Sequence, residues 1–191
     1  MTNPVSVFND WLAEAREAGV AVPEGMTVAT ADAAGRPSAR MLLLKSADES
    51  GFTFFSGYES RKGLELVANP RAALLFYWRP LGRQVRVEGQ VERVLAIESD
   101  AYFATRPRGA QLAAVVSRQG RVLRGREELD AGVAELEREH EGGDVARPEH
   151  WGGYRLTPES YEFWQHREDR LHDRLRYRRA GDAWLVERLS P

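Results

Sequence analysis

The sequence contains no cysteine, and this absence excludes disulfides, iron–sulfur clusters, thiolate zinc sites and a cysteine nucleophile. It has no apolar run that approaches the roughly 18 residues of a membrane span, and its first residues lack the pattern of a signal peptide. Neither sign of charge dominates, because 27 basic residues stand against 29 acidic ones. A basic nucleic-acid surface and a polybasic membrane anchor are therefore disfavoured. We expect a cytoplasmic protein that binds neither nucleic acid nor membrane.

Lysine is almost absent, since only Lys45 and Lys62 occur among the 27 basic residues and the rest are arginines. A genome that favours arginine over lysine would explain this scarcity. The alternative is that these two positions need a compact ammonium group, which a planar guanidinium cannot replace.

The hydrophobic pattern predicts an antiparallel barrel with helices packed on its outside, a mainly β (α+β) fold. Apolar residues recur at helical spacing over residues 4–18, and three alternating segments between residues 26 and 57 favour an antiparallel meander. At 191 residues we expect a single domain covering 1–191, with the first helix in 1–19 and C-terminal strands in 153–191. Further helices are predicted over 60–69, 98–107, 109–116 and 126–141, and further strands over 71–78, 83–94, 154–158, 160–165, 173–179 and 183–189.

The start of the helix over 60–69 is unusual in its charge. Ser60 can cap it, but Arg61 and Lys62 stand just inside, where the helix dipole disfavours cations. Free backbone N–H groups, a hydroxyl and two cations together can bind a phosphate. An ordinary solvated helix end is the alternative.

Other candidate ligand-binding residues are scattered along the chain. Arg40 and Lys45 bracket an apolar strand from opposite faces, and Tyr102 and Arg106 are four residues apart, hence on one helical face. Gln84 and Gln119 carry amides of the kind that a heteroaromatic ring requires. Each of these could equally be an ordinary surface residue.

The C-terminal stretch WQHREDRLHDR, residues 164–174, is the most informative. If residues 170–178 are extended, Arg170, His172 and Arg174 share one face with two further arginines, and such a ladder needs anions or solvent beside it. A flat ligand could stack on Trp164 while His172 binds a ring substituent. A charged edge strand is the alternative.

Several site classes are disfavoured by missing motifs. The four histidines show no zinc-type spacing, so no metal site is expected. There is no GxSxG, GxGxxG or GxxxxGK[ST] motif for a hydrolase, a dinucleotide or a nucleoside triphosphate. One or more flat, phosphorylated ligands remain.

EFWQHREDRLHDR, residues 162–174, closely resembles the C-terminal signature of the pyridoxine/pyridoxamine 5'-phosphate oxidase family. The resemblance extends in common order through RMLLLK, FFSGYESRKG, NPRAALLFYW, RQVRVEGQVERV, YFATRPRGAQ, SRQG, WGGYRL and AWLVERLSP. It implies a split β-barrel homodimer that binds FMN at the subunit interface. The implied reaction is oxidation of pyridoxamine or pyridoxine 5'-phosphate to pyridoxal 5'-phosphate by hydride transfer to the flavin. O2 is the acceptor, H2O2 is released, and the amine substrate also yields ammonia.

The resemblance also implies residue roles. Arg61 and Lys62 would hold the FMN phosphate, and Arg170 and His172 would be catalytic residues at the pyridine ring. The substrate-binding positions are Lys45, Tyr102, Arg106, Arg170 and His172. The FMN-binding positions are Arg40, Met41, Leu42, Leu43, Leu44, Lys45, Phe55, Ser56, Arg61, Lys62, Gln84, Gln119, Gly120, Trp164 and Arg174.

The chain departs from the family pattern at a few positions. Ala110 stands where a serine usually binds the substrate phosphate, and Gly120 replaces a common serine. His166 and Arg167 replace small residues and add bulk, so altered specificity would be sought there first. Two alternatives therefore stand beside the B6 oxidase: a flavin oxidase of the same fold with another substrate, as in phenazine pathways, and a non-catalytic FMN or pyridoxal phosphate binder.

Overall fold

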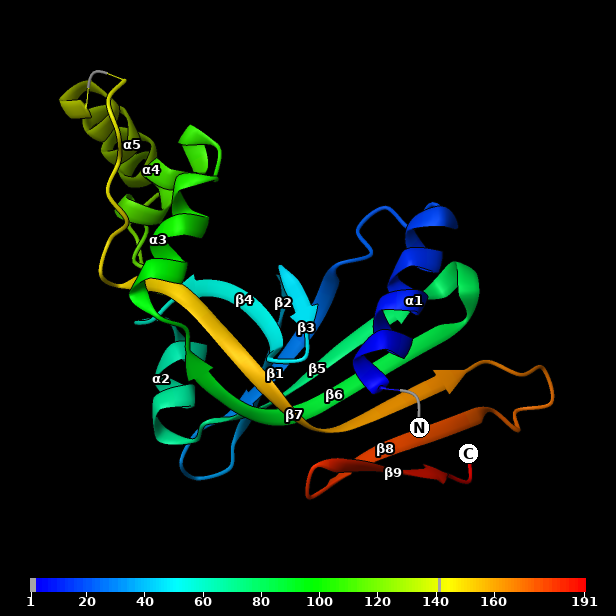
Figure 1. Cartoon of the computed structure of the whole chain (residues 1–191). Helices are drawn as coiled ribbons and strands as arrows, with labels where there is room; N and C mark the ends of the chain where they lie inside the picture. The colour runs from blue at the N-terminus through cyan, green and yellow to red at the C-terminus, as the bar shows by residue number, and fades with distance from the viewer. Residues whose placement is uncertain (1–2, 141) are drawn as a thin grey trace.

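A computed structural model describes residues 3–140 and 142–191 of the chain, which form one curled antiparallel sheet with helices around it (Figure 1). The split-barrel fold predicted from the sequence is confirmed. The helices are α1 Pro4–Glu17, α2 Arg61–Ala68, α3 Ala96–Ala104, α4 Arg108–Val116 and α5 Glu127–His140, with a short 3-10 turn over Arg79–Leu81. The strands are β1 Gly25–Ala31, β2 Pro37–Leu43, β3 Ser46–Asp48, β4 Gly51–Gly57, β5 Arg71–Trp78, β6 Arg83–Arg93, β7 Trp151–Gln165, β8 Asp173–Ala180 and β9 Ala183–Arg188.

Helix α1 closes the main core against the sheet. Its predicted apolar face is buried, and the Phe8 ring lies 4.8 Å from Phe52 and 4.9 Å from Phe76 in edge-on contacts. Trp11, on the same helix, packs on Phe163 near the far end of β7. The helix predicted over 4–18 is confirmed, and it fixes the sheet by burying aromatic area.

The predicted three-strand meander is only partly correct. β1 and β2 pair as a hairpin, but β4 pairs with β7 and with the short strand β3, giving the order β2-β1-β5-β6-β7-β4-β3. β3 lies in the connection between the second and third of the predicted segments, where no separate strand was predicted. A partner more than ninety residues away in the sequence leaves no local signal, so short connections alone could not reveal it.

Strand β7 is the longest element and connects both ends of the fold. It was predicted as two strands, over 154–158 and 160–165, but a single strand of 15 residues runs through both. A bulge leaves Glu159 without a partner, since Glu88 pairs with Ser160 and Gly89 with Pro158. A Cβ at Gly89 would lie 2.0 Å from the Thr157 carbonyl oxygen, so glycine is required there.

Helices α3, α4 and α5 project beyond the sheet beside the start of β7 (Figure 1). They surround a second small core that contains Phe103, Leu112 and Trp151. The helix predicted over 98–107 instead ends at Ala104, before the Arg-Pro pair that stops it. The helix predicted over 126–141 is seen as α5, with Glu141 outside the described residues.

No helix in residues 3–140 and 142–191 is long and apolar enough to cross a membrane. In the same part of the chain, no three histidine, aspartate or glutamate side chains gather in an arrangement that could hold a metal ion. The single-domain assignment stays a prediction.

Candidate active site

The start of α2 builds a compact cationic site, as the sequence predicted. Ser60 caps the helix, with its Oγ accepting a hydrogen bond from the backbone N–H of Gly63. The Lys62 ammonium donates to Ser56 Oγ at 2.8 Å, to Ser60 Oγ at 3.1 Å and to Gln119 Oε1 at 2.8 Å. Lys62, Ser56 and Gln119 were all predicted as cofactor-binding residues, and the structure brings them together.

This ammonium is buried without a counter-charge in contact. Lys62 is only 5% exposed, its acceptors are neutral, and no carboxylate among the described residues forms an ion pair with it. Burial, with a smaller contribution from the Arg40 charge, lowers the pKa of Lys62 to about 8. A buried cation with unused electrostatic capacity fits an anionic ligand, so the donor set suits the phosphate of FMN.

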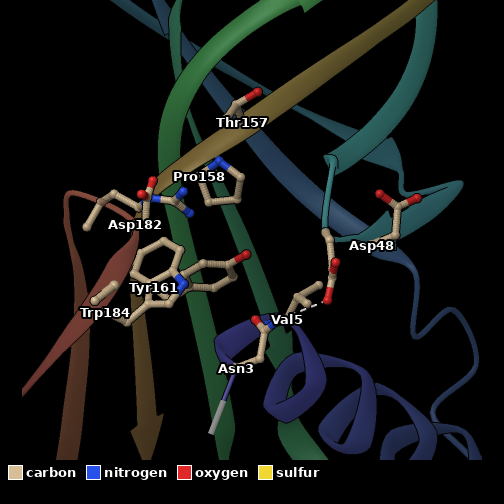
Figure 2. A pocket seen from close by; sticks show the side chains of 11 residues that line it. Asn3, Val5, Asp48, Thr157, Pro158, Tyr161, Asp182 and Trp184 are labelled. Carbon is tan, nitrogen blue, oxygen red and sulfur yellow. Dashed lines mark hydrogen bonds between the residues drawn. The ribbon is translucent and has the colours of Figure 1, made fainter. Parts of the chain in front are cut away.

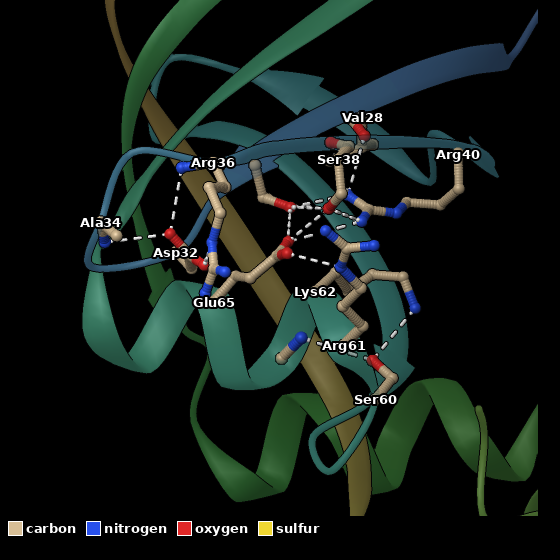
Figure 3. A network of polar contacts seen from close by, with 12 residues as sticks. Val28, Asp32, Ala34, Arg36, Ser38, Arg40, Ser60, Arg61, Lys62 and Glu65 are labelled. Atoms are coloured by element: carbon tan, nitrogen blue, oxygen red, sulfur yellow. Dashed lines mark hydrogen bonds and ion pairs between the residues drawn. The ribbon is translucent and has the colours of Figure 1, made fainter. Parts of the chain in front are cut away.

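Glu65, one turn further along α2, organises the neighbouring arginines (Figure 3). Its Oε2 accepts hydrogen bonds of 2.5 Å from both Thr30 and Ser38, and its Oε1 accepts one of 2.8 Å from Arg61 Nε. Burial alone would raise the pKa of Glu65, but the bonds from Ser38, Thr30 and Arg61 outweigh it and lower the pKa to about 2. Glu65 is therefore ionised at any ordinary pH.

Arg40 reaches the same cluster from β2. Its guanidinium donates to the Val28 carbonyl at 3.0 Å and to Thr30 Oγ1 at 2.7 Å, and it also contacts Ser38 and Glu65. Desolvation by burial lowers the pKa of Arg40 from its usual value. The result is a pair of arginines, Arg40 and Arg61, held on two sides of one carboxylate.

A hollow of about 440 Å³ lies between β2 and the start of α2. Its lining contains most of the predicted cofactor-binding residues of this region. Leu44 does not belong there, because it is 4% exposed in the main core, and Leu43 is exposed at the end of the strand. Gly120 has a backbone φ of 92°, so its departure from serine has a conformational reason. The hollow is lined by Ser38, Ala39, Arg40, Met41, Leu42, Ser60, Arg61, Lys62, Gln119 and Gly120.

The predicted substrate-phosphate residues form a second cationic cluster. The Tyr102 ring stacks on Phe55 with centroids 3.9 Å apart, and the Lys45 ammonium lies 5.6 Å from the Tyr102 ring centre. Arg106 lies beyond the end of α3, not on the same helical face as Tyr102, and its guanidinium covers the Trp151 ring at 4.5 Å. Arg106 is therefore brought near Tyr102 by stacking on Trp151, and not by a shared helical face as predicted.

Arg106 has capacity left for a ligand. Its Nη1 is buried and has no hydrogen-bond partner in residues 3–140 and 142–191. Desolvation lowers the pKa of Arg106, as expected for a guanidinium without a paired carboxylate. Trp151 was not predicted as a site residue, although it belongs to the WGGYRL segment, and only its stacking on Arg106 gives it a role.

The predicted cationic ladder over residues 170–178 is wrong at its first half. β8 begins at Asp173, and Arg170 lies in the preceding loop with φ of 64°, a left-handed conformation found at no other non-glycine residue that the structure describes. The His172 ring lies 4.6 Å from the Trp164 ring and 5.2 Å from the His166 ring. Backbone strain of this kind is often found at functional sites, which agrees with the predicted role of Arg170.

His172 is fixed in one tautomer by the chain itself. Its Nδ1 accepts a hydrogen bond of 3.1 Å from the backbone N–H of Arg167, so a neutral imidazole carries its proton on Nε2. The Arg167 side chain binds Asp173, which also binds Arg188 on β9. Arg167, which was expected only to add bulk, thus holds the loop before β8 in place through its contacts with His172 and Asp173.

Gln84, Trp164 and Arg174 stand on adjacent strands. Trp164 on β7 is the direct partner of Gln84 on β6 and of Arg174 on β8. The Arg174 guanidinium donates to the buried Glu162 at 2.7 Å, and this hydrogen bond raises the pKa of Arg174. Glu162 was not predicted, and no pattern in the sequence distinguishes it from a surface glutamate.

The predicted site residues fall into two groups at opposite ends of the fold (Figure 1). Trp151 contacts the Arg106 cluster at one end of β7, and Trp164 contacts His172 at the other. Trp151 and Trp164 are thirteen positions apart along β7, a path of roughly 40 Å along the backbone. Within one chain, the two groups are therefore separated by most of the length of β7.

A different hollow, of about 480 Å³, lies between the start of α1 and the β8–β9 hairpin (Figure 2). Asn3, Tyr161, Arg179 and Trp184 are among its lining residues, and no predicted site residue lines it. Burial raises the pKa of Tyr161, so its hydroxyl stays protonated. This second hollow is therefore separate from the predicted cofactor and substrate sites.

The curled antiparallel sheet is that of a split barrel, and the buried ammonium at the start of α2 suits a phosphorylated ligand such as a flavin mononucleotide. Two family models match the chain: pyridoxamine 5'-phosphate oxidase over residues 12–138 and the pyridoxine 5'-phosphate oxidase C-terminal dimerisation region over residues 151–191. The chain therefore belongs to the pyridoxamine 5'-phosphate oxidase family, an oxidoreductase family, and this assignment supports FMN as the cofactor.

Individual relatives agree with this assignment. The chain is 57% identical to a pyridoxine/pyridoxamine 5'-phosphate oxidase of Rubrobacter xylanophilus, over 99% of this chain and 87% of that protein, and 52% identical to one of a Cyanothece strain, over 99% and 89%. Among solved structures, PhzG from Burkholderia lata in complex with tetrahydrophenazine-1-carboxylic acid is 37% identical, with a TM-score of 0.95 over 100% of this chain and 94% of that one. An FMN-binding protein from Nostoc punctiforme, 17% identical with a TM-score of 0.80 over 100% and 98%, shares the fold.

Proposed function

We propose that this protein is an FMN-dependent oxidase that converts pyridoxamine 5'-phosphate and pyridoxine 5'-phosphate to pyridoxal 5'-phosphate in the cytoplasm, in vitamin B6 biosynthesis or salvage. O2 is the acceptor, H2O2 is released, and the amine substrate also yields ammonia. The observation that carries the proposal is the second cationic cluster, Lys45 with Arg106, which is separate from the Lys62 site. Two anion sites suit two phosphorylated ligands, FMN and the substrate.

At the cofactor end, Arg61 and Lys62 hold the FMN phosphate, and Gln119 and the N–H of Gly120 supply polar contacts. FMN, when bound, accepts two electrons from the substrate and passes them to O2. The buried Lys62 ammonium favours a dianionic ligand over a neutral one, because a charge in a low-dielectric site gains most from a direct counter-charge. The flavin is also contacted by three residues from the opposite end of the fold, Gln84, Trp164 and Arg174.

At the substrate end, Lys45, Tyr102 and Arg106 bind the 5'-phosphate. Nη1 of Arg106, which has no partner among the residues that the structure describes, gains most, because a phosphate oxygen would satisfy it. Ala110 provides no hydroxyl, so the phosphate has one donor fewer than in the family pattern. Arg170 lies over the pyridine ring, and His172 donates its Nε2 proton toward the ring oxygen.

The two ends meet in a homodimer. Arg170 and His172 of one chain join Lys45 and Arg106 of another, and this assembly is supported by the separation of the two groups along β7 and by the matched C-terminal dimerisation region. An isologous dimer has two such composite sites related by its two-fold axis.

The proposal is tested by mixing the FMN-loaded protein with pyridoxamine 5'-phosphate in the absence of oxygen. We expect bleaching of the flavin absorption band and one equivalent of pyridoxal 5'-phosphate for each flavin reduced. Pyridoxamine without its phosphate is the matched control and should bleach far more slowly. An unbleached flavin at saturating substrate contradicts the proposal.

A second candidate is an oxidase acting on a tetrahydrophenazine carboxylic acid, favoured by the likeness to PhzG and by the departures at Ala110 and His166. Its substrate carries a carboxylate instead of a phosphate. Faster flavin bleaching by tetrahydrophenazine-1-carboxylic acid than by pyridoxamine 5'-phosphate would favour this candidate. A binder without catalysis would release no H2O2 with either compound in air.

A further inference from the structure

Glu65 is a buried carboxylate that touches no expected ligand but holds two of the arginines at the cofactor end (Figure 3). It is 6% exposed and accepts from three elements: Thr30 on β1, Ser38 and Arg40 on β2, and Arg61 on α2. A single side chain thereby links α2 to β1 and to β2, the strand that lines the 440 Å³ hollow.

The contact between Glu65 and Arg61 leaves the two Nη groups of the Arg61 guanidinium available for a ligand. Glu65 binds the Nε of Arg61, and neither Nη atom of Arg61 makes a hydrogen bond within the described residues. Arg61 is itself 67% exposed at its side chain, so without this contact it would sample many rotamers. Fixing Nε restricts the guanidinium while leaving both Nη groups available to a ligand.

We propose that Glu65 is a positioning residue that sets Arg40 and Arg61 in the geometry that binds the phosphate of FMN. The inference rests on the proposed function, because it requires that FMN occupies the hollow beside Lys62. It assigns Glu65 a role in selecting the phosphorylated flavin over riboflavin, which lacks the phosphate.

Charge and position predict opposite outcomes for this residue. A carboxylate near a phosphate repels it, so neutralising Glu65 would tighten FMN if charge alone mattered. If Glu65 acts by orienting the arginines, neutralising it loosens FMN, because mobile side chains must be ordered again on binding. The sign of the change therefore separates the two readings.

The experiment measures FMN and riboflavin dissociation constants for the full-length apoprotein by quenching of flavin fluorescence. For Glu65→Gln we expect the FMN constant to rise about tenfold or more, with the riboflavin constant within about twofold of the parent. Unchanged riboflavin binding shows that the fold is intact. The effect should shrink in an Arg61→Gln background, because Glu65 then has one arginine fewer to orient.

Glu59→Gln is the matched control, since Glu59 pairs with Arg118 and Arg121 at the surface and not with Arg40 or Arg61. It removes the same charge and should leave the preference for FMN unchanged or slightly increased. If Glu65→Gln does not fold, Glu65→Asp, which retracts the carboxylate by one methylene, carries the same test.

An FMN constant that stays the same or falls in Glu65→Gln overturns the inference, as does an equal loss of FMN and riboflavin. An undiminished effect in the Arg61→Gln background overturns the part that acts through Arg61. If the parent protein itself fails to prefer FMN over riboflavin, the proposed function fails first, and that result is visible before any variant is made.

Discussion

The ammonium of Lys62 has a pKa near 8, so its charge changes within an accessible pH range. FMN binding should weaken as the pH rises from about 7 to about 9.5, because the deprotonated amine no longer attracts the phosphate. We expect a loss of about tenfold or more in affinity, measured by fluorescence titration at each pH. Lys62→Gln, which is neutral throughout, should bind FMN weakly with little dependence on pH in this range.

The stability of the apoprotein should follow the opposite trend. The folded-state pKa of Lys62 lies below its unfolded value of 10.5, so the unfolded chain binds more protons between these two values. The Lys62 contribution to the free energy of unfolding therefore increases as the pH rises through this window. Urea titrations that compare the parent with Lys62→Gln isolate this contribution, and a contribution that decreases over the window would contradict the assignment.

Arg170 combines its proposed place over the pyridine ring with a left-handed backbone, and the two can be separated by substitution. Arg170→Gly and Arg170→Ala should both abolish substrate-dependent flavin reduction, because neither has a guanidinium to cover the pyridine ring. Arg170→Gly should have a free energy of unfolding about 1 kcal/mol higher than Arg170→Ala, since glycine adopts a φ of 64° without a Cβ clash. Equal stabilities would show that the loop relaxes out of this conformation.

The loop from His166 to His172 depends on Asp173, which binds Arg167 at 2.8 Å and Arg188 at 2.6 Å. Asp173→Asn should slow flavin reduction by about three- to tenfold while FMN stays bound, because His172 loses its fixed orientation. Anaerobic rapid mixing measures this rate. Asp182→Asn, at the exposed turn between β8 and β9, is the control and should react at the parent rate.

At the level of helices and strands, the sequence predicted those features that depend on residues close together in the chain. The face of α1 around Phe8 and the Ser60 cap of α2 follow from spacing and capping, and both are confirmed. The conformation at Arg170 could not be predicted, because alternating charge continues from the loop into β8 and hides the start of the strand. The stacking of Arg106 on Trp151 was equally hidden, since it joins segments 45 residues apart.

At the scale of the whole molecule, the composite site makes a prediction about mixtures. Arg106→Ala and Arg170→Ala should each be inactive alone, but mixed subunits restore one intact site in every heterodimer. Statistical reassociation after mild unfolding should then give about a quarter of the parent activity. No recovery, with heterodimers verified by mass, would mean that both residues act within one chain.

The near absence of lysine bears on the chemistry of the proposed product. Pyridoxal 5'-phosphate is an aldehyde, and aldehydes condense with unprotonated lysine amines. Lys62 is buried behind three hydrogen bonds, so Lys45 is the sole exposed lysine of the chain, and the other surface cations are guanidiniums. A surface built from arginine keeps its charge and solubility while offering an aldehyde almost nothing to modify.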